Sequence, residues 1–319
     1  MLNILMYIVV ALTITVGVAV FSSNRNQKGR FSAMGLSLAI LGAASWVLFI
    51  QLFRNASNES DASFFHQIFA VTALAIPFGC LLYAVSLLRR KALAITISVA
   101  ALLISVVVGG LILLNDNLFY SNIVISKDNN YSILADSPVT AVYFSVFGVF
   151  FISSIIIIIA RALRSKNAVF KQGLICLACC LILSSSLSSA TNIILPIIGQ
   201  NGLFWVGPLS VSITMLFAYF ITLRYKLFIN SSRLLRYLTY LVAVTVAAMI
   251  YTCLFFVIFG LIFRGAKPSN EIIIFNFITM IIIILLMPSI NSSINRTKKL
   301  ISENGVAPEV VDEEKISAK

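Results

Sequence analysis

The chain alternates between long apolar stretches and short polar stretches that carry Lys and Arg. A helix needs about 20 apolar residues to cross the roughly 30 Å hydrocarbon layer of a membrane. Lipid offers no partners for backbone N–H and C=O groups, so such a stretch predicts a helix. We therefore expect an all-α integral membrane helical bundle of nine spans: Asn3–Ser22, Ser32–Phe53, Gln67–Leu88, Leu93–Leu114, Thr140–Ala160, Gly173–Leu195, Leu203–Leu223, Leu238–Phe263 and Ile272–Ile290.

One connection is longer than the others. Residues 115–139 lie between the fourth and fifth spans and contain two β-favouring arms, FYSNIVIS and YSILA, on either side of KDNN. Asp and Asn tolerate the backbone conformations of tight turns. The pattern predicts a small extracytoplasmic β-hairpin that turns at Lys127 to Asn130, with an irregular loop as the alternative.

Composition supports a membrane protein and charge gives its orientation. The 319 residues are 60% hydrophobic and 11% charged, which is too apolar for a soluble domain. The net charge of +12 comes from Lys and Arg in alternate connections, so we expect no nucleic-acid partner. Lys and Arg concentrate on the cytoplasmic side of membrane proteins. This predicts an outer N-terminus and a cytoplasmic C-terminus, with the first stretch kept as a helix instead of being cleaved as a signal peptide.

Few side chains in the predicted spans could perform chemistry. No Asp, Glu, Lys, Arg or His falls in the middle of a span, although such residues usually mark proton paths and catalytic sites in membranes. His66 lies near an outer end and is interpreted as an interfacial residue. The cysteines, three of them in CLACC, lie in apolar stretches and are interpreted as packing residues. We expect no metal, no cofactor and no enzymatic activity.

Neutral polar residues concentrate in the sixth span and the loop that follows it. Five serines precede Thr191 and Asn192, and Pro196 and Gly199 interrupt the backbone beyond them. Such residues commonly pack helices together. The functional alternative is a polar cavity that opens to the outside, and its candidate ligand-binding residues are Asn192, Gln200, Asn201 and Trp205. Trp205 is equally interpreted as an interfacial anchor.

Two sequence segments resemble a known family. These are NIILPIIG, which ends the sixth span, and FWVGPLSVSITMLFAYFITLRYKLF, which contains the seventh. Together with the predicted hairpin, they resemble the N-terminal seven-helix membrane module of bacterial histidine kinases and related signalling proteins. The residues that match the family's pattern are Asn192, Pro196, Gly207 and Pro208, followed by the membrane-interface signature Arg224, Tyr225, Lys226, Leu227 and Phe228.

The resemblance implies a division of the chain. Residues 1–230 form a seven-helix sensing module, 231–290 a two-helix transmembrane extension and 291–319 a flexible cytoplasmic tail. The family's kinase transmitter is not recognisable, because no cytoplasmic histidine and no Gly-rich nucleotide motif follow the spans. The resemblance therefore implies sensing without kinase activity, in a bacterial cytoplasmic (inner) membrane.

The resulting hypothesis is a non-enzymatic sensory protein that detects an extracytoplasmic or membrane signal. Its expected partners are the lipid bilayer, a cytoplasmic signalling protein or a second copy of the chain, and a small-molecule, lipid or peptide ligand. Two other classes stay open at this point: a structural or assembly subunit of a membrane complex, and a facilitator-type transporter.

Overall fold

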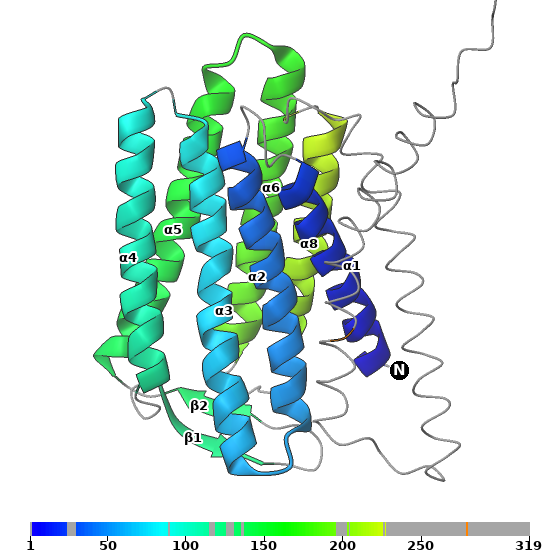
Figure 1. The fold of residues 1–319 in the computed structure, drawn as a ribbon, viewed down its shortest axis with the longest axis vertical. Coiled ribbons are helices and arrows are strands. Elements are labelled where there is room, and N and C mark those ends of the chain that lie inside the picture. Colours follow the sequence, from blue (N-terminus) through cyan, green and yellow to red (C-terminus); the bar gives the residue numbers. More distant parts are fainter. Residues whose placement is uncertain are drawn as a thin grey trace, which may run out of the picture.

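Seven α-helices and one hairpin form the described part of the chain (Figure 1). The computed structural model describes residues 2–23, 30–88, 90–114, 119–125, 131–134, 137–195, 203, 205–225, 227 and 279. The elements in chain order are α1 (Leu2–Ser23), α2 (Arg30–Asn55), α3 (Glu59–Ser86), α4 (Lys91–Leu114), β1 (Tyr120–Val124), β2 (Tyr131–Leu134), α5 (Pro138–Leu163), α6 (Ala168–Ser189), η2 (Ala190–Ile194) and α8 (Val206–Arg224).

The helices run approximately parallel and antiparallel to one another, as expected of a membrane bundle (Figure 1). Five helical stretches are long and apolar enough to cross a membrane: Phe31–Asn55, Glu59–Ser86, Lys91–Leu114, Pro138–Leu163 and Ala168–Asn192. The first and last predicted spans of the seven-helix module correspond to the shorter apolar stretches Met6–Ser22 and Val206–Thr222. Apart from residue 279, the eighth and ninth predicted spans lie outside the described residues.

The third helix begins earlier than its hydrophobicity predicts. We expected it from Gln67, but α3 starts at Glu59. Asn58 caps it, because the Asn58 side chain accepts a hydrogen bond of 2.8 Å from the backbone N–H of Asp61. The carboxylates of Glu59 and Asp61 then occupy the first turn, where the helix dipole favours negative charge. Capping and electrostatics thus extend the helix beyond its apolar stretch.

Glycine allows the closest helix approach in the bundle, between α2 and α3. A Cβ atom on Gly79 would lie 2.7 Å from the carbonyl oxygen of Gly35, and one on Gly35 would lie 2.9 Å from the carbonyl oxygen of Gly79. About two turns further along α2, a Cβ on Gly42 would lie 2.9 Å from the Cβ of Ala75. Small residues at such positions let two backbones pack directly in a membrane, where hydrophobic driving force between helices is absent.

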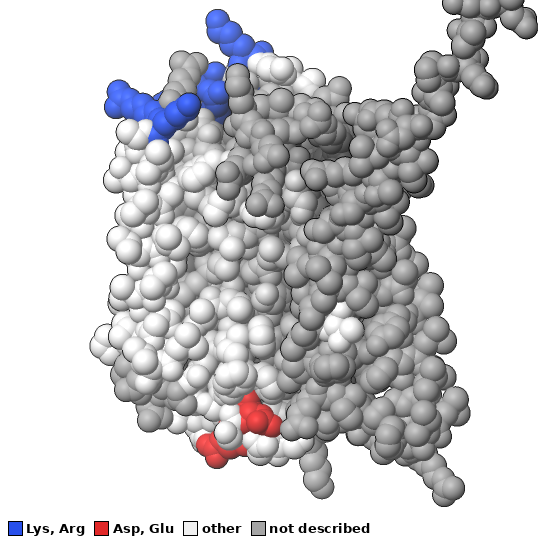
Figure 2. All heavy atoms as spheres, in the orientation of Figure 1, with Lys and Arg blue, Asp and Glu red and all other residues white. Residues whose placement is uncertain are grey.

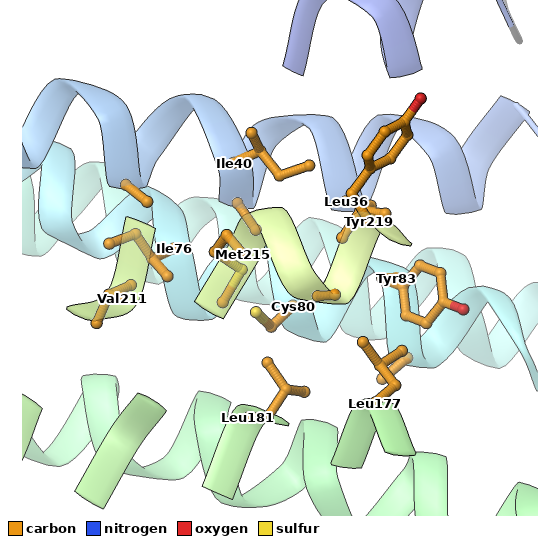
Figure 3. Close-up of a cluster of buried hydrophobic side chains, with 14 of the residues drawn as sticks. Leu36, Ile40, Ile76, Cys80, Tyr83, Leu177, Leu181, Val211, Met215 and Tyr219 are labelled. Carbon is orange, nitrogen blue, oxygen red and sulfur yellow. The ribbon is translucent and has the colours of Figure 1, made fainter. Parts of the chain in front are cut away.

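A second set of contacts joins this pair to α6 and α8. The main apolar cluster contains Ile76 and Cys80 of α3, Leu177 of α6, and Met215 and Tyr219 of α8. Figure 3 shows these side chains converging between the helices. The hydroxyl of Ser212 on α8 also donates a hydrogen bond of 3.0 Å to the carbonyl oxygen of Ala43 on α2. Thus α8 is joined to α2 by a hydrogen bond and to α3 and α6 through the apolar cluster.

The two strands pair antiparallel in the segment where the sequence predicts a hairpin. Asn122 of β1 lies opposite Ile133 of β2, and the register shifts between Tyr120 and Asn122. The predicted turn residues lie outside the described residues. Phe119 and Tyr120 are buried against the bundle, and the hydroxyl groups of Tyr120 and Ser63 lie 2.5 Å apart. Side chains from β1 therefore attach the hairpin to α3.

Charge divides the two ends of the bundle. Figure 2 shows Lys and Arg side chains gathered at one end and Asp and Glu side chains at the other. We call the first the basic end and define it by Arg90, Lys91, Arg161, Arg164, Lys166, Lys171 and Arg224. We call the opposite end, which carries β1, β2 and the first turn of α3, the hairpin end.

The contact between α2 and α3 gives a stability prediction. Gly79→Ala places a methyl group against the backbone of α2, so we expect the free energy of unfolding in mild detergent to fall by about 1–3 kcal/mol. Gly148→Ala on α5 is the matched control, because a Cβ there meets nothing within 4 Å. Equal losses in the two variants would contradict the close approach of the helices.

Candidate functional site

The sixth helix ends in an irregular turn at the hairpin end. After Ser189, α6 continues into the π-helical segment η2. The Thr191 hydroxyl donates to the carbonyl oxygen of Leu187 at 2.9 Å, and Asn192 Nδ2 donates to the carbonyl oxygen of Ser188 at 3.0 Å. Side chains thus supply hydrogen bonds where the regular ladder changes. A π-helical turn often lies at a functional site, and this one contains the predicted site residue Asn192.

Gly207 of α8 packs directly against this turn. A Cβ atom at Gly207 would overlap the Nδ2 atom of Asn192 and would lie 2.5 Å from the Thr191 hydroxyl oxygen. Only glycine therefore fits at this position. Pro208 follows immediately as the third residue of α8 and is buried. The polar turn that follows α6 and the start of α8 form the first of two close glycine contacts, which lie on either side of the apolar packing between these helices.

Trp205 lies one residue before α8 and takes part in a different contact. Its half-buried ring packs against the apolar cluster of α1, α2 and α8 that contains Met6 and Leu209. The Arg54 guanidinium carbon lies 5.6 Å from the ring centroid, within the range of a cation–π interaction. Arg54 Nη1 also donates to Gln51 Oε1 at 3.3 Å. The structure therefore gives Trp205 a cationic neighbour that the sequence pattern does not reveal.

The four predicted ligand-binding residues are thus only partly placed. Asn192 contacts Gly207, and Trp205 contacts Arg54. Gln200 and Asn201 lie outside the described residues. Ligand binding at these four positions stays a prediction.

The second contact between α6 and α8 lies at the basic end. A Cβ atom on Gly173 of α6 would lie 2.6 Å from the Cβ of Tyr225 and 3.0 Å from Leu227 Cδ2. The Cys176 side chain also interacts with Tyr225 and raises its pKa. Arg224, the last residue of α8, is exposed. Two residues of the interface signature therefore pack on α6, while Lys226 and Phe228 lie outside the described residues.

His66 departs from the interfacial position expected for it. Its side chain is 1% exposed, and its ring centroid lies 4.5 Å from that of Phe69 and 4.7 Å from that of Tyr120. The rings of Phe53 and Phe119 complete the cluster at 5.5 and 5.7 Å. His66 is buried because the segment that contains Phe119 and Tyr120 covers it. These two residues are distant in the sequence, so the residues next to His66 do not indicate its burial.

The CLACC cysteines lie near the middle of α6. Cys179 is exposed, and Cys176 and Cys180 are half-buried. Within the described ranges, no three or more His, Cys, Asp and Glu side chains are placed to share a metal ion. Cys176 instead contacts Tyr225, as described above.

The seven helices of the described chain agree with the comparison with known families. A family model described as the N-terminal 7TM region of histidine kinase matches residues 5–231. The chain belongs to this family, and it is a multi-pass membrane protein that carries a sensory region of bacterial histidine kinases. No curated protein and no solved structure matches the chain.

A double-mutant cycle tests the contact between η2 and α8. We expect Gly207→Ala to lower the free energy of unfolding by about 1–3 kcal/mol, because the added methyl group overlaps the Asn192 side chain. Asn192→Ala removes a hydrogen bond and should cost about 0.6 kcal/mol. The combined variant should be less destabilised than the sum, since the shorter side chain makes room for the methyl group. Strict additivity would show that the two residues do not touch.

Proposed function

We propose that residues 1–230 form a non-enzymatic sensory module that detects a signal outside the cytoplasm or in the membrane and passes it to a cytoplasmic partner. Membership of the histidine kinase 7TM family supports the sensory class. The seven-helix region is the non-catalytic module of those kinases. The direction of the signal and its route through the bundle are inferred from charge and packing.

The observation that carries the proposal is the double attachment of α6 to α8. At the hairpin end Gly207 of α8 meets Asn192 of η2, and at the basic end Gly173 of α6 meets Tyr225 beyond α8. The glycine in each contact has no side chain, so the two helices lie close together at both ends. Because they are closely packed, we infer that a shift of one helix moves the other. Tightly packed interfaces of this kind change between discrete arrangements instead of deforming gradually.

A stimulus acts on this pair by favouring one of two arrangements. The ligand must bind one arrangement more tightly than the other, because equal affinity would leave the equilibrium unchanged. The irregular turn η2 is the natural place for the change, since its side-chain hydrogen bonds are local and modest in strength. The displacement then reaches Tyr225, where the chain leaves the module.

Charge supports the direction of transmission. Lys and Arg gather at the basic end, which supports a cytoplasmic position for that end and an outward-facing hairpin end. With this orientation the N-terminus lies outside. We further propose that residues 231–290 form a two-helix extension that carries the change onward and that residues 291–319 form a cytoplasmic tail. Both segments lie outside the described residues.

Coupling between the two ends is testable without knowledge of the ligand. We expect Gly207→Ala, a change at the hairpin end, to alter the distance between spin labels at exposed positions 166 and 224 of the basic end. The labels are introduced in a variant whose five cysteines are replaced by serine. Double electron–electron resonance in nanodiscs should show a shifted or newly split distance distribution.

The matched control is Gly110→Ala on α4, where a Cβ meets nothing within 4 Å. It should leave the distribution unchanged. If Gly207→Ala destabilises the protein but leaves the basic-end distance distribution identical to that of the control, the α6–α8 pair does not transmit the change.

Proximity labelling from a biotin ligase fused to the C-terminus tests the partner. Labelling of a kinase, cyclase or response regulator would support signalling. Labelling of membrane subunits alone, in fixed stoichiometry, would contradict it.

A further inference from the structure

A half-buried cation lies at the basic end, where α5 meets α3 and α4. Ile157 of α5 packs with Leu88, just beyond α3, and with Ala94 of α4 in one apolar cluster. Arg161 follows Ile157 by four positions, so it projects from the same face of α5 one turn nearer the basic end. Among the residues that the structure describes, its buried Nε atom has no hydrogen-bond partner. Buried N–H groups without an acceptor are rare, so this one needs an explanation.

Three more cations belong to the same corner of the bundle. Arg164 follows Arg161 by three positions, which makes the two side chains neighbours on the helix surface. Arg90 and Lys91 lie at the start of α4, two and three positions after Leu88. Like charges at short separations repel one another. An anion bound among them would replace that repulsion with attraction.

The described residues supply no acid to these cations. Glu59 and Asp61 are the acids that the structure describes, and both lie in the first turn of α3. That turn belongs to the hairpin end, at the opposite side of the bundle (Figure 2). The described chain therefore leaves the positive charge of this corner to be balanced by another molecule.

The start of α4 has the same preference for an anion. The carbonyl oxygen of Arg90 accepts a hydrogen bond from the N–H of Ala94, as the carbonyl of a capping residue does. The guanidinium of Arg90 has donors only, so this side chain cannot cap the N–H groups of the first turn. A helix N-terminus favours negative charge, and here it lies beside cationic side chains.

The surface next to this corner suits the acyl chains of a lipid. Large apolar side chains are exposed along α4 from its first turn onward: Leu93, Ile95, Val99, Leu103 and Val106. In a membrane such a face contacts lipid chains. A headgroup bound at the start of α4 would therefore have its acyl chains beside an apolar surface, which a soluble anion does not need.

We propose that Arg161, Arg90 and Lys91 form a binding site for the phosphate group of an anionic phospholipid, taken from the leaflet at the basic end. The phosphate supplies the acceptor that Arg161 lacks, because guanidinium donors match phosphate oxygens in geometry and charge. Basic sites between membrane helices recognise lipid headgroups in this way. The site goes beyond the proposed sensory function and holds for either orientation of the bundle.

Native mass spectrometry of the protein in a mild detergent measures the site directly. Phosphatidylglycerol and phosphatidylcholine with the same acyl chains are titrated separately, and the retained lipid gives an apparent Kd for each. We expect tighter retention of phosphatidylglycerol, because the choline group of phosphatidylcholine offsets the phosphate charge. A third series adds inorganic phosphate to the phosphatidylglycerol complex at equimolar concentration, and we expect the lipid to stay bound.

Variants assign the lipid to the proposed residues. Arg161→Gln should weaken retention of phosphatidylglycerol by about tenfold, because it removes charge-assisted hydrogen bonds. Arg161→Lys keeps the charge without the planar guanidinium and should lie between Arg161→Gln and the parent, which preserves the test if Arg161→Gln fails to fold. Lys166→Gln removes the same charge from the exposed loop between α5 and α6, and this control should bind phosphatidylglycerol as the parent does.

Three results would overturn the site. The first is an equal apparent Kd for the two lipids. The second is displacement of phosphatidylglycerol by inorganic phosphate, which would assign the cations to a soluble anion. The third is a loss in the Arg161 variants no larger than the loss in Lys166→Gln, which would show that only net charge matters. None of these measurements involves the α6–α8 contacts, so the lipid site and the proposed transmission can fail independently.

Discussion

The hydrocarbon interior of a membrane accepts neither charge nor unpaired backbone groups, and the organisation of this protein follows from that constraint. Helices satisfy their own backbone, so the described chain crosses as helices and keeps its only two strands at one end. Charged side chains gather at the two ends of the bundle (Figure 2). The same constraint removes the hydrophobic drive that packs soluble helices, and close contact through glycine replaces it. Gly35 and Gly79 hold α2 against α3, and Gly173 and Gly207 hold α6 against α8.

The two helix pairs differ in the kind of contact that joins them. The α2–α3 contact is continuous, from Gly35 to Gly42 along α2, and is suited to a fixed frame. The α6–α8 contact combines the apolar cluster, which includes Leu177, Met215 and Tyr219, with two glycine contacts, one beside an irregular turn and one where the chain leaves α8. In the proposed mechanism, this second pair carries the change across the membrane. The aromatic cluster around His66 adds a further link, because it ties the hairpin to the frame.

The sequence predicted the parts of this arrangement that depend on local properties. Apolar length and basic connections predicted the helices of the seven-helix module, and the LRYKLF signature indicated where the module ends. Hydrophobicity does not reveal the cap at Asn58, and α3 therefore begins before the predicted Gln67. Family membership was recognisable from short motifs around Asn192 and Gly207, which the structure brings into contact.

The remaining features depend on residues far apart in the chain. Arg54 and Trp205 are separated by about 150 positions, and the sequence around one residue does not predict its contact with the other. His66 was interpreted as an interfacial residue because it lies near the outer end of a predicted span. The residues that bury it, Phe119 and Tyr120, belong to the distant hairpin segment. Nor does a glycine in an apolar stretch reveal its partner: Gly207 and Gly173 touch side chains, whereas Gly110 and Gly148 face open space. Such distinctions arise only from packing.

The direction of sensing is the central claim, and thiol labelling in intact cells tests it most directly. Single cysteines at exposed position 122 of β1 and at exposed position 166 of the loop between α5 and α6 are compared in a cysteine-free variant, using a reagent that does not cross the membrane. The account predicts labelling at 122 in intact cells and at 166 only after the cells are opened. Labelling of 166 with protection of 122 would invert the bundle and contradict an outward-facing receptor.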